Sequence, residues 1–448
     1  MGVDCNTITV RKTTTATELA AQASDKRLRT WEEQVPSVYH QYGRVFSNEE
    51  STRFPESRPW DHAIDLLPEA PPTLNCKVYP LAEGQQEALD KFLDEHLAKG
   101  YIRRSNSPYA SPFFFVKKKD GKLRPVQDYR TLNNWTVRNT YPLPLIKELI
   151  SKLAKKKWFT KLNIRWGYNN VRIKEGNEWK TSFKTNRGLF ECLVMFFGLT
   201  NSPATFQTMM DALFDDLVTT GNVIIYMDDI LIVTDSDDIE EHIKIVSIVL
   251  KRLEDNDLFL KPEKCHFHRR EVEYLGVIVG NGQVKMDPIK VKGLTDWPIP
   301  TTVSELRSFL GFGNYYKDFI QDYSRLARPL HDLTKKNHTW KWEDDQQNTF
   351  DTLKRKFTSY PVLRNPDPTK RYILDTDASA HAIRATVSQD FTDGCHPITF
   401  FSKSVTFSRL KNFIFTCLPI LSHHMICSHP LFHHMTLSPD CLPIVLTM

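Results

Sequence analysis

The sequence predicts an α+β fold, in which helices and antiparallel strands alternate along the chain. Residues 237–255, DDIEEHIKIVSIVLKRLED, place their apolar side chains with the period of an amphipathic helix. Residues 112–128 contain two runs of high β propensity around Asp120 and Gly121, a dipeptide typical of hairpin turns. A second pair of short apolar runs lies within 223–234. Isolated hairpins combined with amphipathic helices favour small sheets covered by helices.

The other elements are predicted from local signals of the same kind. Residues 83–99 carry apolar side chains on one face, and Gly100 is a good helix stop. Ser202 followed by Pro203 has the pattern of an N-cap and a first helical residue. The further predicted elements are helices at 83–99, 202–218 and 302–322, a strand at 158–163 and a β-rich segment at 370–402.

The composition indicates a core-forming protein. Of the 448 residues, 40% are hydrophobic and 25% are charged, which argues against global disorder. No apolar run approaches the ~20 residues that a membrane span needs, and the first residues have no apolar signal-peptide core. The eight cysteines are scattered over the chain. We therefore expect an intracellular protein, in the cytoplasm or nucleus, with reduced thiols and no membrane partner.

The charge is distributed unevenly. Residues 98–187 contain 22 Lys and Arg but only 5 Asp and Glu, a local balance of +17. Because the whole chain carries +5, the remainder sums to −12. A basic block interleaved with aromatic residues suggests a polyanionic partner, although a solvated basic surface would have the same composition.

The acidic pair Asp228 and Asp229 lies between two apolar runs, within the sequence VIIYMDDILIVT. Two carboxylates close to a core repel each other and are costly to desolvate, and a bound divalent cation would remove that cost. Mg²⁺ prefers hard oxygen ligands, which paired Asp side chains supply. The alternative is an ordinary Asp-Asp hairpin turn that faces solvent.

The acidic pair belongs to one of six sequence blocks that follow one another along most of the chain. They are PWDHAIDL, SPYASPFFFVKKKDGKLRPVQDYRTLN, FTKLNIRWGYNNVRIKEGNEWKTSF, GLFECLVMFFGLTNSPATFQ, IIYMDDILI and EYLGVIV. With these blocks the chain resembles, from about Arg58 to about Phe415, the reverse transcriptase of a gypsy-type (Metaviridae) LTR retrotransposon polyprotein. No gag, protease or integrase portion is visible, so we expect a fragment of a larger polyprotein or a degraded copy.

The resemblance implies a right-hand polymerase of fingers, palm and thumb/connection, followed by a truncated RNase H-like α/β segment. The implied divisions are an N-terminal spacer at 1–70, fingers and palm at 71–280, thumb and connection at 281–360, the RNase H-like segment at 361–415 and an unrelated or frame-shifted tail at 416–448.

The resemblance also implies which residues carry the chemistry. Members of this family extend a primer on an RNA or DNA template with deoxynucleoside triphosphates, and three palm aspartates hold two Mg²⁺ ions, or Mn²⁺ in their place. Asp228 and Asp229 match two of the three. The third position, the Asp of the family's F-T-K-L-D pattern, is Asn163 here. Because an amide brings no negative charge to the metals, we expect impaired activity.

Residues of the predicted hairpin and of the next block are implied to bind the nucleotide. Lys118 and Arg124 match family positions that contact the triphosphate, where Arg binds phosphate bidentately and Lys acts as a point charge. Tyr168 matches the aromatic residue that lies under the sugar and excludes a 2′-OH. The alternatives are a solvated basic hairpin and a core aromatic residue.

Two further positions are implied to bind nucleic acid. Gln207, with Pro203 and Phe206, matches the template-side helix of the family and is expected to bind substrate. Leu275 and Gly276 match the turn that holds the primer end, for which the alternative is an ordinary strand end.

The RNase H-like resemblance, YILDTDASAHAIRATVSQ, supplies few carboxylates. Asp377 matches the first metal-binding aspartate of that domain, whereas Arg384 replaces a glycine that is usual in the strand. The later acidic residues cannot be assigned after Phe415. Because RNase H chemistry needs a cluster of carboxylates around two metals, we do not expect RNase H activity.

The last 33 residues, 416–448, differ in composition from the rest. Asp440 is their one charged residue, and they hold five of the 15 His and three of the eight Cys. This break suggests a shifted reading frame or read-through into unrelated sequence. Family-like sequence in another frame of the nucleotides would support a shifted frame, and its absence would refute it. A zinc site is the alternative, although its spacing fits no standard pattern. The candidate ligands are Cys417, Cys427, His429 and His433.

Two functions are compatible with these residues. The first is an RNA-directed DNA polymerase impaired by Asn163. The second is a non-catalytic remnant that still binds nucleic acid through its basic fingers.

Overall fold

The computed structural model describes most of the chain and divides it into two compact units. The described residues are 30–404 and 444–447, except 83, 118–120, 122, 154, 337, 360–362, 368 and 379–381; of 377, 378, 382, 383, 404 and 444–447 only the backbone is described. The first unit comprises the residues up to 143 with 160–232 and 238–268, and the second comprises the remainder. Each unit is described by itself.

The first unit contains a five-stranded sheet in the region predicted as fingers. Its order is β1-β6-β5-β2-β3, and β2 and β3 form the predicted hairpin, with Phe113 opposite Gln127. Helix α3 (Gln85–Ala98), predicted at 83–99, buries Leu89, Phe92 and Leu93 against this sheet. The strands are β1 (Ile102–Arg104), β2 (Ser111–Lys117), β3 (Leu123–Gln127), β5 (Phe183–Thr185) and β6 (Gly188–Cys192).

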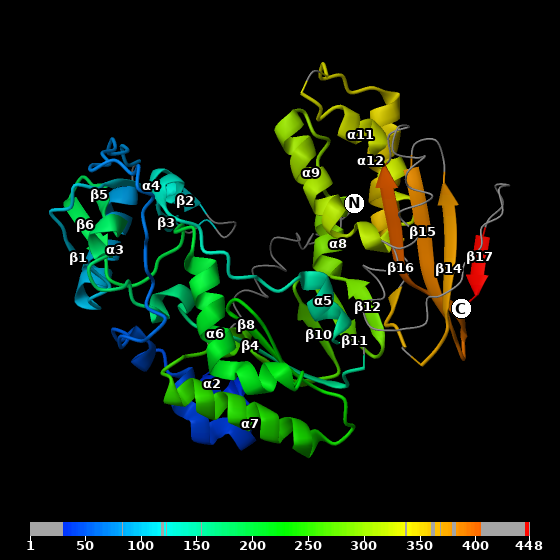
Figure 1. Ribbon diagram of the computed structural model, residues 1–448, viewed down its shortest axis with the longest axis horizontal. Helices are drawn as coiled ribbons and strands as arrows, with labels where there is room; N and C mark the ends of the chain where they lie inside the picture. Colours follow the sequence, from blue (N-terminus) through cyan, green and yellow to red (C-terminus); the bar gives the residue numbers. More distant parts are fainter. Residues whose placement is uncertain are drawn as a thin grey trace, which may run out of the picture. The chain divides into compact units, whose positions relative to one another are not determined.

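The predicted palm is a four-stranded sheet with the order β7-β8-β4-β9. Helices α6 (Ser202–Thr219) and α7 (Ile239–Asp255) contribute to the same buried cluster as these strands, and Figure 1 shows both helices beside β4 and β8. The strands are β4 (Trp158–Asn163), β7 (Val223–Tyr226), β8 (Asp229–Thr234) and β9 (His266–Arg269). Short helices in this unit are η3 (Gly167–Asn170), η4 (Glu178–Thr181), α4 (Arg130–Trp135) and η5 (Pro262–Lys264).

The start of α6 differs from the prediction by one residue. The N-cap is Asn201, and Ser202 is the first helical residue, with a buried hydroxyl that has no hydrogen-bond partner among the described residues. The side chain of Asn201 does not cap the helix either. It accepts from the amide of Asn139 and donates to the carbonyl of Val137, so it holds the preceding loop.

The described part of the predicted spacer belongs to the first unit. Val35, Tyr39, Val45 and Phe46 are buried in the palm cluster, within or next to α2 (Trp31–Gln34) and η1 (Ser37–Phe46). A third short helix, η2 (Glu50–Thr52), follows. These residues of the predicted N-terminal spacer therefore pack into the core of the palm through their apolar side chains.

The second unit contains a sheet with the order β10-β11-β12-β13 and a group of helices. The helix predicted at 302–322 is shorter: α9 (Val303–Tyr315) ends at Tyr316, and Ile320 is extended. The strands are β10 (Glu271–Tyr274), β11 (Val277–Gly280), β12 (Gln283–Met286) and β13 (Leu363–Arg364). The other helices are α5 (Ile146–Ser151), α8 (Pro288–Thr295), η6 (Lys317–Phe319), α10 (Tyr323–Leu326), α11 (Arg328–Asp332) and α12 (Asp344–Thr358).

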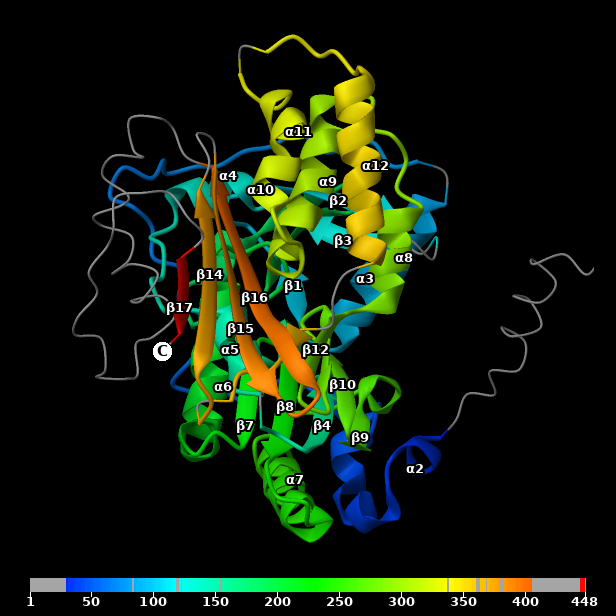
Figure 2. The same cartoon turned by 90° about the vertical axis from the view of Figure 1, so that its right-hand side faces the viewer.

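The β-rich segment predicted at 370–402 forms an antiparallel sheet with the order β16-β15-β14-β17. Figure 2 shows the long strands of this sheet side by side. Ser324 of α10 bonds Ser402 of β16 through its backbone amide and its hydroxyl, which joins the sheet to the helices. The strands are β14 (Tyr372–Ala378), β15 (Ala382–Phe391), β16 (Gly394–Ser404) and β17 (Ile444–Thr447).

None of the helices in the described part of the chain is both long and apolar enough to cross a membrane.

Candidate active site

The two adjacent aspartates lie at the hairpin that joins β7 to β8. Tyr226 pairs with Asp229, so Met227 and Asp228 form a two-residue turn. Met227 has a φ of +58°, a left-handed conformation that is uncommon for a residue other than glycine. Asp228 is exposed and Asp229 is half-buried. The hairpin predicted from the sequence therefore presents both carboxyl groups at the end of the palm sheet.

Gln207 of α6 forms a hydrogen bond with the backbone of this turn. Its Oε1 accepts a 3.0 Å hydrogen bond from the amide of Met227, and its Nε2 donates to Oδ1 of Asp211 at 2.8 Å. The side chain of Gln207 has no exposed surface. Gln207 is thus buried behind the turn and does not lie on the surface predicted to bind substrate. It acts on the site indirectly, through its hydrogen bond to the amide of Met227.

Asn163, at the end of β4, lies directly against both aspartates. Its side-chain Nδ2 donates to Oδ2 of Asp228 at 3.3 Å and to Oδ1 of Asp229 at 3.0 Å. Asn163 is 7% exposed, and its Oδ1 is buried without a hydrogen-bond partner among the described residues. The structure therefore brings the three predicted palm positions together, with an amide donor where the family has an acid.

The donor set fits a divalent cation only in part. Asp228 and Asp229 offer adjacent carboxylate oxygens of the kind that Mg²⁺ prefers. Asn163 turns its N–H groups toward them, and an N–H group cannot ligate a cation. No cluster of three or more His, Cys, Asp or Glu with metal-binding geometry occurs in the described part of the chain. The amide would have to turn over to present its oxygen.

An aromatic group extends from the aspartates toward the fingers. The Tyr168 ring lies 4.9 Å from the Phe197 ring and 5.7 Å from the Phe206 ring, measured between centroids. Burial, and secondarily the charge of Asp228, raises the pKa of the Tyr168 hydroxyl to about 12. Tyr168 therefore stays neutral at physiological pH and presents a ring rather than a charge.

Phe197 is a site residue that was not predicted from the sequence. It is 59% exposed, and the guanidinium carbon of Arg124 lies 4.5 Å above its ring centre. Arg124 is on β3, so this contact joins the fingers hairpin to Tyr168. A possible sequence signal was the pair Phe196-Phe197 before Gly198, because only Phe196 of that pair enters the core.

Other predicted positions are less fully described. Lys118 lies outside the described residues. Asp377 is on β14, where its backbone pairs with Arg384, and its side chain is not described. The Arg384 side chain donates to Oδ2 of Asp322 at 2.5 Å, so this departure from the usual glycine forms an ion pair within the second unit.

The predicted primer-binding residues, Leu275 and Gly276, form the turn between β10 and β11 in the second unit. Tyr274 pairs with Val277, and both turn residues have positive φ, 48° and 81°. Positive φ at both central residues is the mark of a type I′ hairpin turn, which favours Asn or Gly at the first position. Leucine at this position is therefore unusual.

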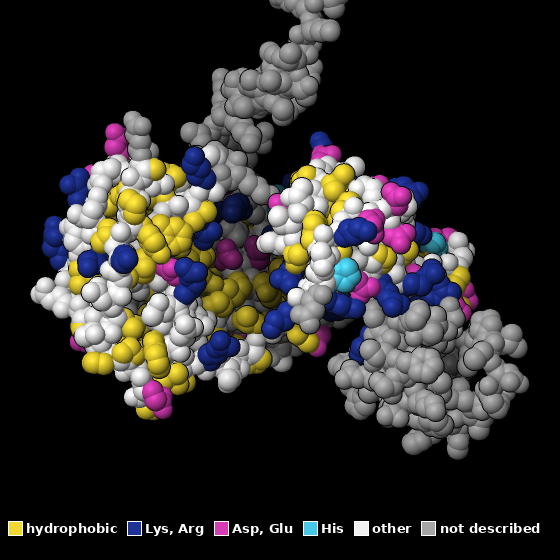
Figure 3. All heavy atoms as spheres, turned by 90° about the horizontal axis from the view of Figure 1, so that it is seen from above, with side chains coloured by type: hydrophobic (Ala, Val, Ile, Leu, Met, Phe, Trp, Pro, Cys, Tyr) yellow, Lys and Arg dark blue, Asp and Glu magenta, His cyan; other side chains and the backbone are white. Residues whose placement is uncertain are grey.

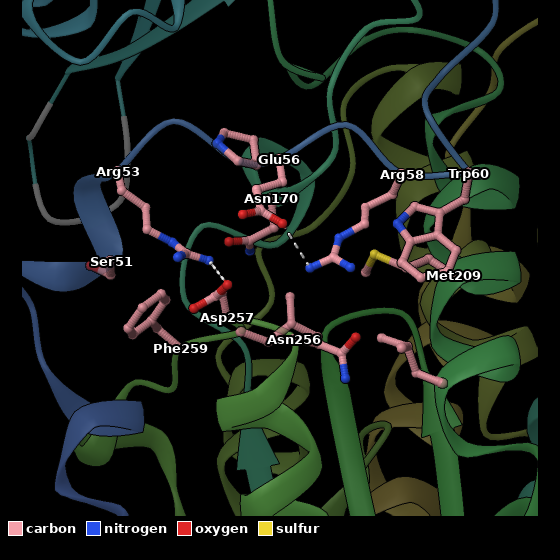
Figure 4. A pocket seen from close by; sticks show the side chains of 13 residues that line it. Ser51, Arg53, Glu56, Arg58, Trp60, Asn170, Met209, Asn256, Asp257 and Phe259 are labelled. Atoms are coloured by element: carbon pink, nitrogen blue, oxygen red, sulfur yellow. Dashed lines mark ion pairs between the residues drawn. The ribbon is translucent and has the colours of Figure 1, made fainter.

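A small cavity of about 30 Å³ lies in the first unit, away from the predicted site residues (Figure 4). Arg53 forms a 2.5 Å ion pair with Asp257 in its wall, and Arg58 pairs with Glu56 at 3.2 Å. Arg44 reaches the other carboxylate oxygen of Asp257 at 2.6 Å. The space is too small for a nucleotide, and the two ion pairs of Asp257 join the N-terminal segment to the residues that follow α7.

The surface of the fingers carries basic and apolar side chains together. Figure 3 shows Lys and Arg side chains beside hydrophobic ones on the face that this view presents. Exposed apolar residues of the first unit include Val116 and Phe197, and Arg124 lies directly over the second. Such mixed surfaces suit the stacked bases and phosphates of nucleic acid.

Two protein families match the chain. The family described as reverse transcriptase (RNA-dependent DNA polymerase) matches residues 116–279. The RNase H-like domain found in reverse transcriptases matches residues 342–417, and this range includes α12.

Similar proteins cover most of the chain. The Tf2-3 and Tf2-7 transposon polyproteins of Schizosaccharomyces pombe are each 34% identical to it over 382 residues, 85% of this chain. The chain spans about 28% of the length of these curated relatives. The solved structure of a foamy viral protease-reverse transcriptase with an RNA/DNA hybrid has a TM-score of 0.75 at 20% identity, covering 94% of this chain and 57% of that one. The same viral protein with double-stranded DNA gives 0.75, covering 92% and 86%.

The fold is thus that of a right-hand polymerase followed by an RNase H-like domain. Together with the ordered sequence blocks and the Tf2 relatives, these matches show that the chain belongs to the reverse transcriptases of gypsy-type LTR retrotransposon polyproteins.

Proposed function

We propose that the chain is an RNA-directed DNA polymerase whose nucleotidyl transfer is impaired by Asn163. The observation that carries this proposal is the pair of hydrogen bonds from the Asn163 amide to Asp228 and Asp229. The two hydrogen bonds stabilise the carboxylates of Asp228 and Asp229 without supplying the third negative charge that the family uses to hold its cations. Asn163 thus occupies the place of the third acidic residue of the polymerase site, and it hydrogen-bonds the other two carboxylates in place of binding a cation with them.

Asp228 and Asp229 would hold Mg²⁺, or Mn²⁺, in an active form of this site. Metal ions of this kind stabilise the charge on the attacking and leaving oxygens of phosphoryl transfer. The residues of the chain supply the geometry: Gln207 fixes the amide of Met227, and the left-handed Met227 directs both carboxyl groups to the end of the hairpin. Asn163 contributes no charge there, whereas an aspartate would.

The incoming nucleotide is proposed to bind against the aromatic side chains of Tyr168, Phe197 and Phe206 in the first unit. Tyr168 is placed against Phe206 and Phe197, and Arg124 covers Phe197 with a charge that can bind phosphate oxygens. This supports the assignment of Arg124 and Tyr168 as nucleotide-binding residues. Lys118, from the same hairpin, would add a second cation.

The polynucleotide partner is proposed to be a template–primer duplex. The local charge of +17 over residues 98–187 supports binding to a polyanion. The foamy viral relatives are bound to an RNA/DNA hybrid and to double-stranded DNA, which are the substrates expected of a reverse transcriptase. Leu275 and Gly276 are proposed to contact the primer strand.

A second candidate function is a non-catalytic protein that binds nucleic acid. The same contact of Asn163 favours it, because the two carboxylates gain a donor without any cation. We further propose that the RNase H-like domain does not cleave RNA, since Asp377 is its one assigned acidic residue. Incubation with an RNA/DNA hybrid and Mg²⁺ tests this directly, and specific cleavage would refute it.

Primer extension distinguishes the two functions. The full chain and its Asn163→Asp variant would be compared on one RNA template and DNA primer, with Mg²⁺ and separately with Mn²⁺. We expect the variant to extend the primer at least tenfold faster in Mg²⁺, because it restores the missing ligand charge. Asn222→Asp, which adds the same charge before β7, is the matched control and should change little.

Each outcome decides between the proposals. Extension by the variant with little extension by the natural chain supports an impaired polymerase. Equal and robust extension by both would show that Asn163 does not impair the site. Absence of extension in both, with duplex binding retained, would favour the non-catalytic function.

A further inference from the structure

The turn at Leu275 and Gly276 is held by three hydrogen bonds from outside its own backbone. The Tyr316 hydroxyl donates to the carbonyl of Gly276 at 2.7 Å, and the Tyr315 hydroxyl donates to the carbonyl of Leu275. The amide of Gly276 donates to Oε1 of Glu273 at 3.1 Å. Both carbonyls of a two-residue turn are therefore bonded to adjacent residues at the end of α9.

This arrangement opposes the intrinsic preference of the turn. Leu275 adopts φ +48°, a conformation that is costly for a branched side chain and that persists only where the surroundings hold it. Gly276 suits its φ of +81°, and a Cβ there would also make a tight contact, 3.2 Å, with the Tyr316 hydroxyl. The hydrogen bonds from the tyrosines therefore stabilise a turn conformation that an Asn-Gly sequence would favour by itself.

The two tyrosines are anchored differently. Tyr316 is 2% exposed, and its ring lies 5.2 Å from the Phe312 ring and 6.1 Å from the Phe319 ring. Tyr315 is 41% exposed, with its ring edge-on to Tyr316 at 4.8 Å. The buried Tyr316 thus fixes the turn to the core around α9. The exposed Tyr315 lies beside the turn, so that the turn and the end of α9 form one continuous surface.

We propose that Tyr315 and Tyr316 are positioning residues that lock the Leu275–Gly276 turn and join it to α9, so that both bind the sugar–phosphate backbone of the primer strand as one surface. The inference rests on the proposed function in assigning the primer strand to this turn. Without the two hydroxyl groups the turn would sample other conformations, and the duplex would have to order it on binding.

The test uses Tyr315→Phe, Tyr316→Phe and the double variant in the full chain. Tyr323→Phe is the matched control, because its hydroxyl donates to the carbonyl of Leu310 within the same unit but away from the turn. The probe is a labelled DNA primer annealed to an RNA template, titrated by fluorescence anisotropy without divalent cations. Hydrogen exchange of a peptide covering 271–280 reports the turn itself, and Tm reports global stability.

We expect the double variant to bind the duplex about three- to tenfold more weakly, the range that one or two hydrogen bonds allow. Exchange at the turn should quicken, while Tm changes no more than in the control. Unchanged exchange, unchanged affinity, or an equal loss of affinity in Tyr323→Phe would each overturn the proposal. So would a natural chain that does not bind the duplex.

Failure of this inference can be separated from failure of the polymerase proposal. Tyrosine-dependent binding without extension by Asn163→Asp would leave the positioning role intact and refute the polymerase. The opposite result is also distinct. If Asn163→Asp extends the primer, and the tyrosine variants change neither that extension nor the duplex affinity, the polymerase proposal stands and the positioning role is refuted.

Discussion

The side-chain amide of Asn163 donates a 3.0 Å hydrogen bond to Oδ1 of Asp229 and a longer one, 3.3 Å, to Oδ2 of Asp228. The amide thereby acts on both carboxylates at once. Its own oxygen is left buried without a hydrogen-bond partner among the described residues. An unpaired buried acceptor costs about 1–3 kcal/mol, and the two hydrogen bonds to charged acceptors offset that cost.

Asn163→Asp should therefore make stability depend on Mg²⁺. Without divalent cations the variant brings three carboxylates together, and we expect it to lose on the order of 1–2 kcal/mol of unfolding free energy through like-charge repulsion. Saturating Mg²⁺ should stabilise the variant, by about 2.7 kcal/mol at one hundred times its Kd, and the natural chain much less. Thermal unfolding in EDTA and in Mg²⁺ measures both effects.

The control for that experiment is Asn222→Asp, which adds a carboxylate outside the site. A Mg²⁺-dependent rise in Tm of the same size in this control would point to non-specific cation binding. An Asn163→Asp variant as stable as the natural chain in EDTA would contradict the repulsion on which the prediction depends.

Replacing Gln207 should loosen the catalytic turn. Gln207→Leu keeps the approximate volume of a fully buried side chain but removes the acceptor of the Met227 amide and the donor to Asp211. We expect a loss of about 2 kcal/mol in unfolding free energy, and faster amide exchange at Met227. Urea denaturation and hydrogen exchange measure the two effects.

Gln86→Leu is the matched control, because Gln86 donates to Asp90 with the same spacing along a helix but outside the palm. It should change stability by no more than about 0.5 kcal/mol. A similar loss in both variants would mean that the helical Gln-Asp pair, and not the turn, accounts for the effect.

The sequence predicted the elements that are encoded locally and missed those that depend on distant contacts. Helix α7 follows from the period of its apolar residues and the β7–β8 hairpin from two short apolar runs, and the structure confirms both. The end of α9 does not: the helix stops at Tyr316, whose hydroxyl bonds Gly276 some 40 residues away in the sequence. The periodic pattern beyond it cannot reveal that contact.

The candidate site shows the same division. The motif around Asp228 and Asp229 located the carboxylates, and the resemblance located Asn163 beside them. The direction in which the Asn163 amide points depends on its contacts with the β7–β8 hairpin, so it required the structure. Phe197 was missed for a related reason: an exposed phenylalanine in an apolar block looks like core until its neighbours are placed.

Phe197 should contribute to nucleotide affinity more than to turnover. Phe197→Ala, made in an Asn163→Asp background so that extension can be measured, removes the ring between Arg124 and Tyr168. We expect KM for the nucleotide to rise about tenfold, consistent with the ~1–3 kcal/mol of one stacking contact, and kcat to change less. Ile248→Ala, an equally simple truncation at an exposed position of α7, should leave both constants unchanged. A fall in kcat at constant KM would contradict a binding role.

Acidification below pH 6.5 should destabilise the palm through two buried histidines. Burial lowers the pKa of His62 to about 4, and burial with a nearby His268 lowers that of His242 to about 4. In the unfolded chain both titrate near 6.5, so between pH 6.5 and 4 the unfolded state binds protons that the folded state does not. Stability is therefore complete above pH 6.5 and falls as the pH decreases toward 4.

The loss should be about 2 kcal/mol per histidine at pH 5. His62 accepts or donates one hydrogen bond to the Thr205 hydroxyl at 2.9 Å, which a glutamine amide can replace. His62→Gln should accordingly lose about 2 kcal/mol less than the natural chain between pH 7 and pH 5, measured by urea denaturation at both values. An identical pH dependence in the two proteins would show that His62 is protonated without unfolding, and would leave His242 as the main acid-sensitive group.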